Sequence, residues 1–244
     1  VYVGRHAWIM DLLVNFIVAQ AGRRFGLDGK KHRMTVVAVG GYGRGELAPF
    51  SDIDILFVMS ETQASAIEKT IEFSLYLLWD LGLKVGHATR TVRETIDAAK
   101  ADQTVLTGLI DMRKIAGHQQ LYGQLESAVA AIVSKTKTSV FVEQKLTERD
   151  QRHARFGVTR YVVEPNIKEG KGGLRDLHTL FWITKFAYRT NNVLDLVDQL
   201  LRHLLPLRDE HGGCGRRLPV AALLGHPRVD ARRERGRPRC FGLQ

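Results

Sequence analysis

One segment constrains the fold of this chain more than any other: a glycine pair at residues 40 and 41, ten further residues, and then Asp-Ile-Asp at residues 52–54. A β-branched run, Thr35–Val39, leads into the glycine pair and predicts a strand that stops there. The apolar run Asp52–Val58 predicts a second strand with two carboxylates at its head. Two strands joined by the glycine-punctuated turn Gly41–Pro49 therefore predict the centre of a small sheet.

The two carboxylates of the second predicted strand belong to one face of it. Successive side chains of a strand point to opposite faces, so Asp52 and Asp54 share a face, with Cα atoms about 6.5–7 Å apart. Ile53, Ile55 and Phe57 alternate with them and should pack on the opposite face. Carboxylates at this spacing can share one metal ion or hold two that are about 3.5–4 Å apart, as in phosphoryl-transfer sites. The sequence therefore predicts Asp52 and Asp54 as metal-binding and catalytic residues.

The chemistry of the expected ligands indicates which metal this site would bind. Like charges this close repel each other, so the pair is costly without cations. The ligands are oxygen atoms alone, and both cysteines, Cys214 and Cys240, lie far along the chain. Such a ligand set favours Mg²⁺, with Mn²⁺ as a substitute, over zinc.

The glycine turn predicts a site for phosphate groups. Gly40 and Gly41 allow a sharp turn at a strand end and close approach of the backbone to a ligand. Free N–H groups there can bind phosphate oxygens, especially if a helix begins within residues 42–47. Arg44 would neutralise or clamp a triphosphate. A Gly-Gly turn or an Asp-x-Asp pair alone is more often structural or solvated, but their combination favours catalysis.

The remaining chain has the spacing of helices around one further strand. An N-terminal helix is predicted at His6–Phe25, where Trp8, Leu12, Phe16 and Ala19 lie along one apolar stripe. Later elements are predicted as a helix at Ala64–Leu81, a strand at Leu83–Thr89 that Gly86 weakens, short helices at Thr91–Ala99 and Val105–Arg113, and helices around 120–134, 140–155 and 177–188.

These elements predict an α/β (α+β) fold with a small mixed sheet, followed by mostly helical material. We expect an N-terminal helix within residues 1–29, a catalytic domain at 30–117 and a truncated helical domain at 118–205. No apolar run approaches the ~20 residues that a membrane span needs. The chain starts with Val1 and has no leader pattern, so we expect a cytoplasmic protein that lacks its true start and has no membrane partner.

The last part of the chain differs in composition. The formal net charge is +10, which by itself suggests a polyanionic partner such as nucleic acid. From residue 202 onward, however, ten arginines, four acidic residues and no lysine supply +6 of that charge, so nucleic acid is not an expected partner. Residues 206–244 hold four of the six prolines and are typical of a GC-rich gene translated out of frame. The alternative is a disordered basic tail that binds RNA, and we assign the segment no function.

The pattern of a strand ending in Gly-Gly, followed by Asp-x-Asp on the next strand, resembles the signature of the nucleotidyltransferase superfamily. Residues 40–57, Gly-Gly-Tyr-Gly-Arg-Gly-Glu-Leu-Ala-Pro-Phe-Ser-Asp-Ile-Asp-Ile-Leu-Phe, resemble one branch, the bacterial PII uridylyltransferase/uridylyl-removing enzymes. Residues 83–90, 109–117 and 164–178 are also similar to that branch. The resemblance covers residues 1 to about 200.

This resemblance implies an enzyme that transfers UMP from UTP to a tyrosine of the PII signal protein and releases pyrophosphate. Gly40 and Gly41 would position the triphosphate, and Asp52 and Asp54 would hold the metal ions. The related glutamine synthetase adenylyltransferases are one alternative. An inactive fragment that binds nucleotide or protein is another.

Other members of the superfamily carry a third carboxylate on the strand after the next helix. The corresponding segment here, Lys84–Arg90, has none. Asp111 is a candidate for that role, although it falls in a predicted helical segment. His87 is a candidate for orienting substrate, but a histidine on a strand is more often satisfied by its own neighbours.

A second dense cluster combines glycines with basic residues at 168–176. Such a loop before a helix suits contact with an anion. In the alternative reading, Asp176 caps the helix and the basic side chains are solvated. The family resemblance favours a substrate contact, so Lys168 and Arg175 are predicted to bind nucleotide.

Overall fold

The computed structural model describes residues 2–27, 33–61, 65–155 and 166–189, and the chain divides into two compact units, Val1–Lys135 and Thr136–Gln244. The tail predicted at 206–244 lies outside the described residues. The predicted catalytic segment 30–117 lies within the first unit, which also includes the N-terminal helix and the helix that follows the segment. The predicted domain boundaries themselves stay predictions.

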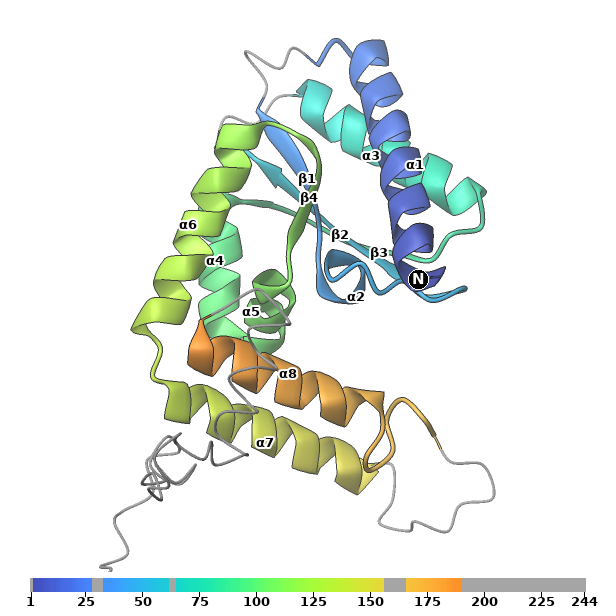
Figure 1. The fold of residues 1–244 in the computed structure, drawn as a ribbon. Helices are drawn as coiled ribbons and strands as arrows, with labels where there is room; N and C mark the ends of the chain where they lie inside the picture. Colours follow the sequence, from blue (N-terminus) through green and yellow to red (C-terminus); the bar gives the residue numbers. More distant parts are fainter. Residues whose placement is uncertain (1, 28–32, 62–64, 156–165, 190–244) are drawn as a thin grey trace, which may run out of the picture. The chain divides into compact units, whose positions relative to one another are not determined.

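The first unit combines helices with a four-stranded sheet (Figure 1). Its elements are α1 (Tyr2–Arg24), β1 (Met34–Ala38), α2 (Gly40–Gly43), β2 (Ile53–Met59), α3 (Ser65–Asp80), β3 (Val85–Thr91), α4 (Val92–Ala101), α5 (Gln103–Ile110), β4 (Arg113–Gly117) and α6 (Gln119–Lys135). The described part of the second unit contains α7 (Thr138–Arg155) and α8 (Leu174–Tyr188). None of the described helices has the length and hydropathy to cross a membrane.

The sheet is mixed, with strand order β3-β2-β1-β4. Strand β1 pairs antiparallel with both β2 and β4, whereas β2 pairs parallel with β3. The parallel pair is connected by α3, as a crossover requires. The predicted α/β fold with a small mixed sheet is confirmed.

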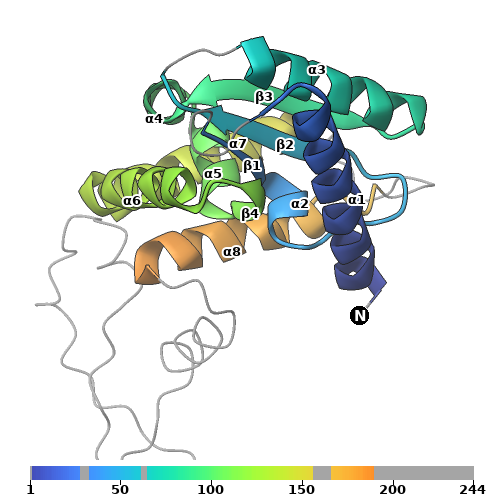
Figure 2. The ribbon, with the colours of Figure 1, turned by 90° about the horizontal axis from the view of Figure 1, so that it is seen from above.

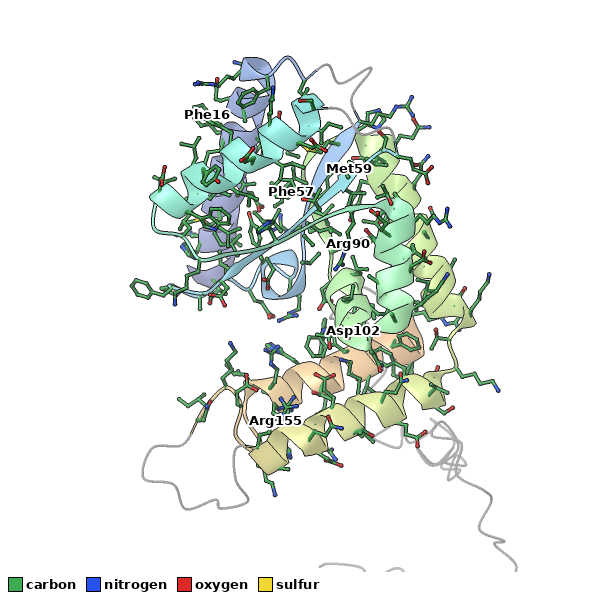
Figure 3. All side chains as sticks on the ribbon, turned by 180° about the vertical axis from the view of Figure 1, so that it is seen from behind. Phe16, Phe57, Met59, Arg90, Asp102 and Arg155 are labelled. Atoms are coloured by element: carbon green, nitrogen blue, oxygen red, sulfur yellow. The ribbon has the colours of Figure 1, made fainter. Side chains whose placement is uncertain are left out.

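Helices cover both faces of the sheet (Figure 2). Ile53, Ile55 and Phe57 of β2 join the core formed with α1 and α3, which confirms the predicted packing of these three residues (Phe57 in Figure 3). Leu56 and Val58 join the other core, formed with α4, α5 and α6. Because β2 is buried on both faces beyond Asp54, its sequence is continuously apolar there.

Helix α1 was predicted correctly as a helix, but its apolar stripe does not face the core. Trp8, Leu12 and Phe16 are 60%, 51% and 62% exposed (Phe16 in Figure 3). The buried face instead contains smaller or β-branched residues: Ala7, Val14, Ile17, Val18 and Ala21. Two apolar faces lie on this helix, and periodicity alone does not distinguish which one packs against the sheet.

The predicted helix Val105–Arg113 is wrong at its end. Helix α5 ends at Ile110, and Arg113 begins β4, an edge strand that the sequence analysis missed. Five residues, Arg-Lys-Ile-Ala-Gly, are too short and too polar to show a clear strand period. Tertiary contacts stabilise the strand instead. It pairs with β1, and Thr35 Oγ1 donates a 3.0 Å hydrogen bond to the Ala116 carbonyl oxygen.

The two helices of the second unit pack through aromatic side chains. The rings of Phe141 on α7 and Phe186 on α8 stack with centroids 4.0 Å apart and an interplanar angle of 4°. The Lys145 ammonium lies 5.2 Å from the centre of the Trp182 ring and donates to Glu148 at 2.6 Å. The ion pair with Glu148 explains how Lys145 can be only 2% exposed, because a buried charge is tolerated when it is paired.

Candidate functional site

The structure places Asp54 as the second residue of β2, with Asp52 just before the strand begins. Both aspartates are exposed, whereas Ile53 and Ile55 are buried. This alternation is what a strand with both carboxylates on one side produces. Further along β2, Leu56 and Val58 lie on the same side as the two carboxylates. They pack in the core formed with α4, α5 and α6.

The carboxylate of Asp54 lies between two glycines from different elements. A methyl group added to Gly40, the first residue of α2, would lie 3.4 Å from Asp54 Oδ2. One added to Gly86, the residue of β3 that pairs with Asp54, would lie 2.5 Å from Asp54 Oδ1. The Val39 N–H also donates to the Asp54 carbonyl oxygen at 3.1 Å. The fold thus brings together the glycine turn and the Asp-x-Asp motif.

The glycine turn itself forms one short helical turn, α2, that begins at Gly40 with a φ of 59°. The condition considered from the sequence, a helix that begins within residues 42–47, is not met there: α2 begins two residues earlier, and Gly40 tolerates the left-handed φ at its start. Gly43 allows α2 to pack closely: a methyl group on it would lie 2.2 Å from the Asp111 carbonyl oxygen. The N–H groups of the first turn of a helix have no acceptor within that helix.

Arg44 follows α2 and is held in place by two carboxylates. Its Nη1 donates to Asp111 Oδ2 at 3.0 Å, and its Nε donates to Glu46 Oε2 at 2.8 Å. The Arg44 side chain is 10% exposed, and that of Asp111 is completely buried. A methyl group on Gly41 would lie 3.8 Å from Arg44 Nη2, so the guanidinium lies alongside the turn.

Asp111, the candidate third carboxylate, was predicted within a helix, and the structure corrects that placement, whereas its role stays a prediction. It is the residue after α5, between that helix and β4, and its carboxylate accepts the hydrogen bond from Arg44. Within the described ranges, no three His, Cys, Asp or Glu side chains gather closely enough to hold a metal ion. A buried carboxylate needs a paired charge, and Arg44 supplies it.

A second arginine, at the start of β4, also contacts α2. Arg113 of β4 donates to the Tyr42 carbonyl oxygen at 3.1 Å, to the Gly43 carbonyl oxygen at 3.3 Å and to Asp11 of α1 at 2.5 and 3.1 Å. Arg113 therefore adds side-chain donors at the end of α2, where the Tyr42 carbonyl oxygen also accepts from the Gly45 N–H at 3.0 Å. Burial, together with the charge of Asp11, raises the pKa of the Tyr42 phenol well above its ordinary value, so this side chain stays neutral.

Asp11 and Arg113 were missed by the sequence analysis. They are 102 positions apart, and each is an ordinary charged residue within its own element. No local motif connects them. The signal that could have found them is the pairing of β4 with β1, which places Arg113 beside the glycine turn.

His87 lies on the other face of the sheet from the Asp54 carboxylate. It pairs in register with Ile55, and its ring contacts the Trp79 ring of α3 at a centroid distance of 5.7 Å. The neighbouring Gly86 is the residue that faces Asp54. This geometry fits the reading in which His87 is satisfied by its neighbours, and it gives no support to a role in orienting substrate.

Lys168 and Arg175 belong to the second unit, so the structure describes them in that unit alone. The backbone N–H of Lys168 donates to Asn166 Oδ1 at 3.0 Å, and its side chain is exposed. The Arg175 Nε lies 3.6 Å from Glu169 Oε1. Their role in nucleotide binding stays a prediction.

Asp176 connects the loop that contains these residues to helix α7 through hydrogen bonds. Its carboxylate accepts hydrogen bonds from the Gly172 N–H at 2.8 Å, from Arg152 Nη2 at 2.5 Å and from His153 Nε2 at 3.0 Å. Partial desolvation raises the pKa of Asp176, but these three donors outweigh it and hold the pKa below its ordinary value. Gly173, not Asp176, is the N-cap of α8, so Asp176 closes the loop from the first turn of the helix.

Comparisons with known proteins add to this geometry. The family described as nucleotidyltransferase domain matches residues 27–105, which include both aspartates and the glycine turn. The family described as GlnD PII-uridylyltransferase matches residues 140–206. The bifunctional uridylyltransferase/uridylyl-removing enzyme of Rhodospirillum rubrum is 46% identical over 190 residues, which are 78% of this chain and 20% of the relative. This chain belongs to the uridylyltransferase/uridylyl-removing enzyme family.

Other relatives agree with this family. The enzyme of the same name from Rhodopseudomonas palustris is 52% identical over 167 residues, covering 68% of this chain and 18% of that protein. This member of the family spans about a fifth of the length of the curated relatives that it matches. A solved structure, a toxin-antitoxin with AMP-PNP, covers 58% of this chain at 16% identity with a TM-score of 0.30, a likeness too distant to bear on the site.

Proposed function

We propose that this chain transfers UMP from UTP to a tyrosine hydroxyl of the PII signal protein and that Asp52 and Asp54 are its catalytic, metal-binding residues. One observation carries the proposal: the Asp54 carboxylate lies between Gly40 of the glycine turn and Gly86 of β3, in a member of this enzyme family. In the reaction, the tyrosine oxygen forms a bond to the α-phosphorus while the bond from that phosphorus to the β-phosphate oxygen breaks. The tyrosine loses its proton, and pyrophosphate leaves.

The side chains at the head of β2 fit a divalent cation. Asp52 and Asp54 are exposed, offer oxygen ligands and carry like charges that a cation would neutralise. We propose Mg²⁺, with Mn²⁺ as a substitute. When bound, such an ion supplies positive charge that stabilises the phosphoryl group during transfer and makes the hydroxyl a better nucleophile.

We propose that the glycine turn binds the triphosphate. Gly40 presents backbone without a side chain next to Asp54, and Gly41 does so next to the Arg44 guanidinium. The Arg44 guanidinium, which Asp111 and Glu46 hold in place, lies alongside this turn as a further hydrogen-bond donor. Phosphate oxygens are bound well by such a combination of N–H groups and an arginine.

We also propose that Lys168 and Arg175 of the second unit contact the nucleotide or its acceptor. The loop is compact, since a methyl group on Gly173 would lie 2.6 Å from the Ile167 carbonyl oxygen, and its basic side chains reach solvent. A fixed backbone with exposed cations suits an anionic ligand. We propose the cytoplasm as the place of action and neither membrane nor nucleic acid as a partner.

The experiment for nucleotide and acceptor uses the chain with Mg²⁺ and one α-labelled nucleotide at a time, UTP, ATP or CTP. Each reaction contains either purified PII or purified glutamine synthetase as the acceptor protein. Label transferred from UTP to PII alone supports the proposal. Transfer of label from ATP to glutamine synthetase would instead support the adenylyltransferase alternative. No transfer from any nucleotide, by protein shown to be folded, would favour an inactive fragment.

A further inference from the structure

Gly86, the second residue of β3, is of a type that strands disfavour. It pairs with Asp54 in the parallel register of β2 and β3. The strand therefore presents hydrogen, rather than a side chain, to the residue that is proposed to bind metal. A glycine inside a strand often marks close approach by another group, and here that group is the Asp54 carboxylate.

Within the part of the chain that the structure describes, that carboxylate is what fills the space next to Gly86. A methyl group on Gly86 would meet Asp54 Oδ1 at 2.5 Å and Asp54 Cγ at 3.7 Å, and apart from its chain neighbours no other heavy atom of the described residues is within 4 Å. Gly86 does not have a positive φ, so its backbone conformation is open to any residue type. An alanine therefore fits the strand, and the side chain of Asp54 is what has to move.

On its other side, the carboxylate faces α2. A methyl group on Gly40 would lie 3.4 Å from Asp54 Oδ2, at ordinary van der Waals distance. The side chain of Asp54 is consequently held between α2 and β3. A group added at Gly86 would turn the carboxylate away from its present orientation.

We infer that Gly86 is a positioning residue, which keeps open the space in which the Asp54 carboxylate is oriented for metal binding. This inference rests on the proposed function of Asp54. It also explains the absence of a carboxylate at this point of β3, because any side chain there would displace Asp54.

The test compares the full chain with its Gly86→Ala, Gly123→Ala and Asp54→Asn variants. Gly123 in α6 is the matched control, since a methyl group there would meet no heavy atom of the described residues within 4 Å beyond its own helix backbone and chain neighbours. The first readout is retention of labelled UTP in equilibrium dialysis across a series of Mn²⁺ concentrations. The second is transfer of label to PII, resolved into kcat and KM for PII.

Gly86→Ala should need about tenfold to hundredfold more Mn²⁺ for half-maximal UTP retention, the range seen when groups that orient metal ligands are altered. Its kcat should fall about a hundredfold with KM for PII unchanged, since a displacement of about 1 Å can cost that much. Gly123→Ala should behave like the wild type in both readouts.

Two outcomes separate the inference from the function on which it rests. If Gly86→Ala matches Gly123→Ala while Asp54→Asn loses Mn²⁺-dependent UTP retention, the inference about Gly86 is wrong and the proposed function stands. If the wild type and Asp54→Asn retain UTP equally and without dependence on Mn²⁺, the proposed metal site is wrong, and the inference falls with it.

A stability measurement keeps the inference testable if Gly86→Ala unfolds more easily than the wild type. The same substitution is then made in an Asp54→Ala background, where the carboxylate that the methyl group would meet is absent. We expect the loss of stability to disappear there. An equal loss in both backgrounds would show that the new methyl group does not act through Asp54.

Discussion

Arg44 donates a 3.0 Å hydrogen bond to the buried carboxylate of Asp111, although the two residues are 67 positions apart. This ion pair connects the residue after the glycine turn to the segment between α5 and β4. It fixes the turn from its C-terminal side. The backbone proposed to bind phosphate therefore depends for its position on Asp111, a residue far from the glycine turn in sequence.

Asp111→Asn should lower the free energy of unfolding by about 1.5–3 kcal/mol, the contribution of a hydrogen bond to a charged group. Urea denaturation of the wild type and the variant measures the difference. Glu46→Gln is the matched control, because its side chain is 51% exposed and an exposed partner of the same arginine should contribute less than about 1 kcal/mol. Equal losses in the two variants would refute a special role for Asp111.

Arg113→Met should loosen α2, since its guanidinium donates to the Tyr42 and Gly43 carbonyl oxygens and to Asp11. Hydrogen exchange should become faster at the amides of residues 40–46, and stability should fall by about 1.5–3 kcal/mol. Lys100→Met, which removes a cation that is 61% exposed on α4, serves as the comparison. Unchanged exchange in Arg113→Met would mean that the turn is held without this residue.

Asp176 should make the second unit sensitive to acid. Its pKa is lowered in the folded state, so its stabilising contribution is complete above the ordinary pKa of an aspartate, about 3.9, and is lost as the pH falls through the folded value. Asp176→Asn should be less stable than the wild type near pH 6, and the difference should shrink toward pH 3. Trp182 fluorescence in a Trp8→Phe/Trp79→Phe background reports on this unit alone. A difference that is constant with pH would contradict the assignment.

The two apolar faces of α1 should respond differently to substitution. Ile17→Ala should cost about 2–5 kcal/mol, because Ile17 is 5% exposed in the core with α3. Leu12→Ala should stay within about 0.5 kcal/mol, because Leu12 is 51% exposed. Chemical denaturation compares the two. A larger loss for Leu12→Ala would mean that the Trp8-Leu12-Phe16 stripe is the buried face after all.

Much of the fold follows from local patterns in the sequence. The alternation of Asp52 to Phe57 correctly predicted which residues of β2 enter the core with α1 and α3. Strongly periodic segments such as α3 and α6 were predicted close to their observed bounds. These features are local, because side-chain periods of 2 and 3.6 are properties of the strand and helix themselves.

What the sequence did not predict depends on contacts between distant segments. Strand β4 exists through its pairing with β1, and nothing in its five residues distinguishes it from the end of a helix. Arg113 and Asp111 become part of the surroundings of the glycine turn only once β4 is placed. Gly86 looked like a weakness of β3, whereas its role depends on the register that sets it against Asp54.

The most direct test of the central claim is the rate at which UMP is transferred from α-labelled UTP to PII by an Asp52→Asn/Asp54→Asn variant. Asp97→Asn, which changes an aspartate with a side chain 61% exposed on α4, is the matched control. We predict that the double variant folds like the wild type but transfers no detectable label, while Asp97→Asn keeps the wild-type rate. Transfer by the double variant at the wild-type rate would contradict the assignment of these two carboxylates as the catalytic site.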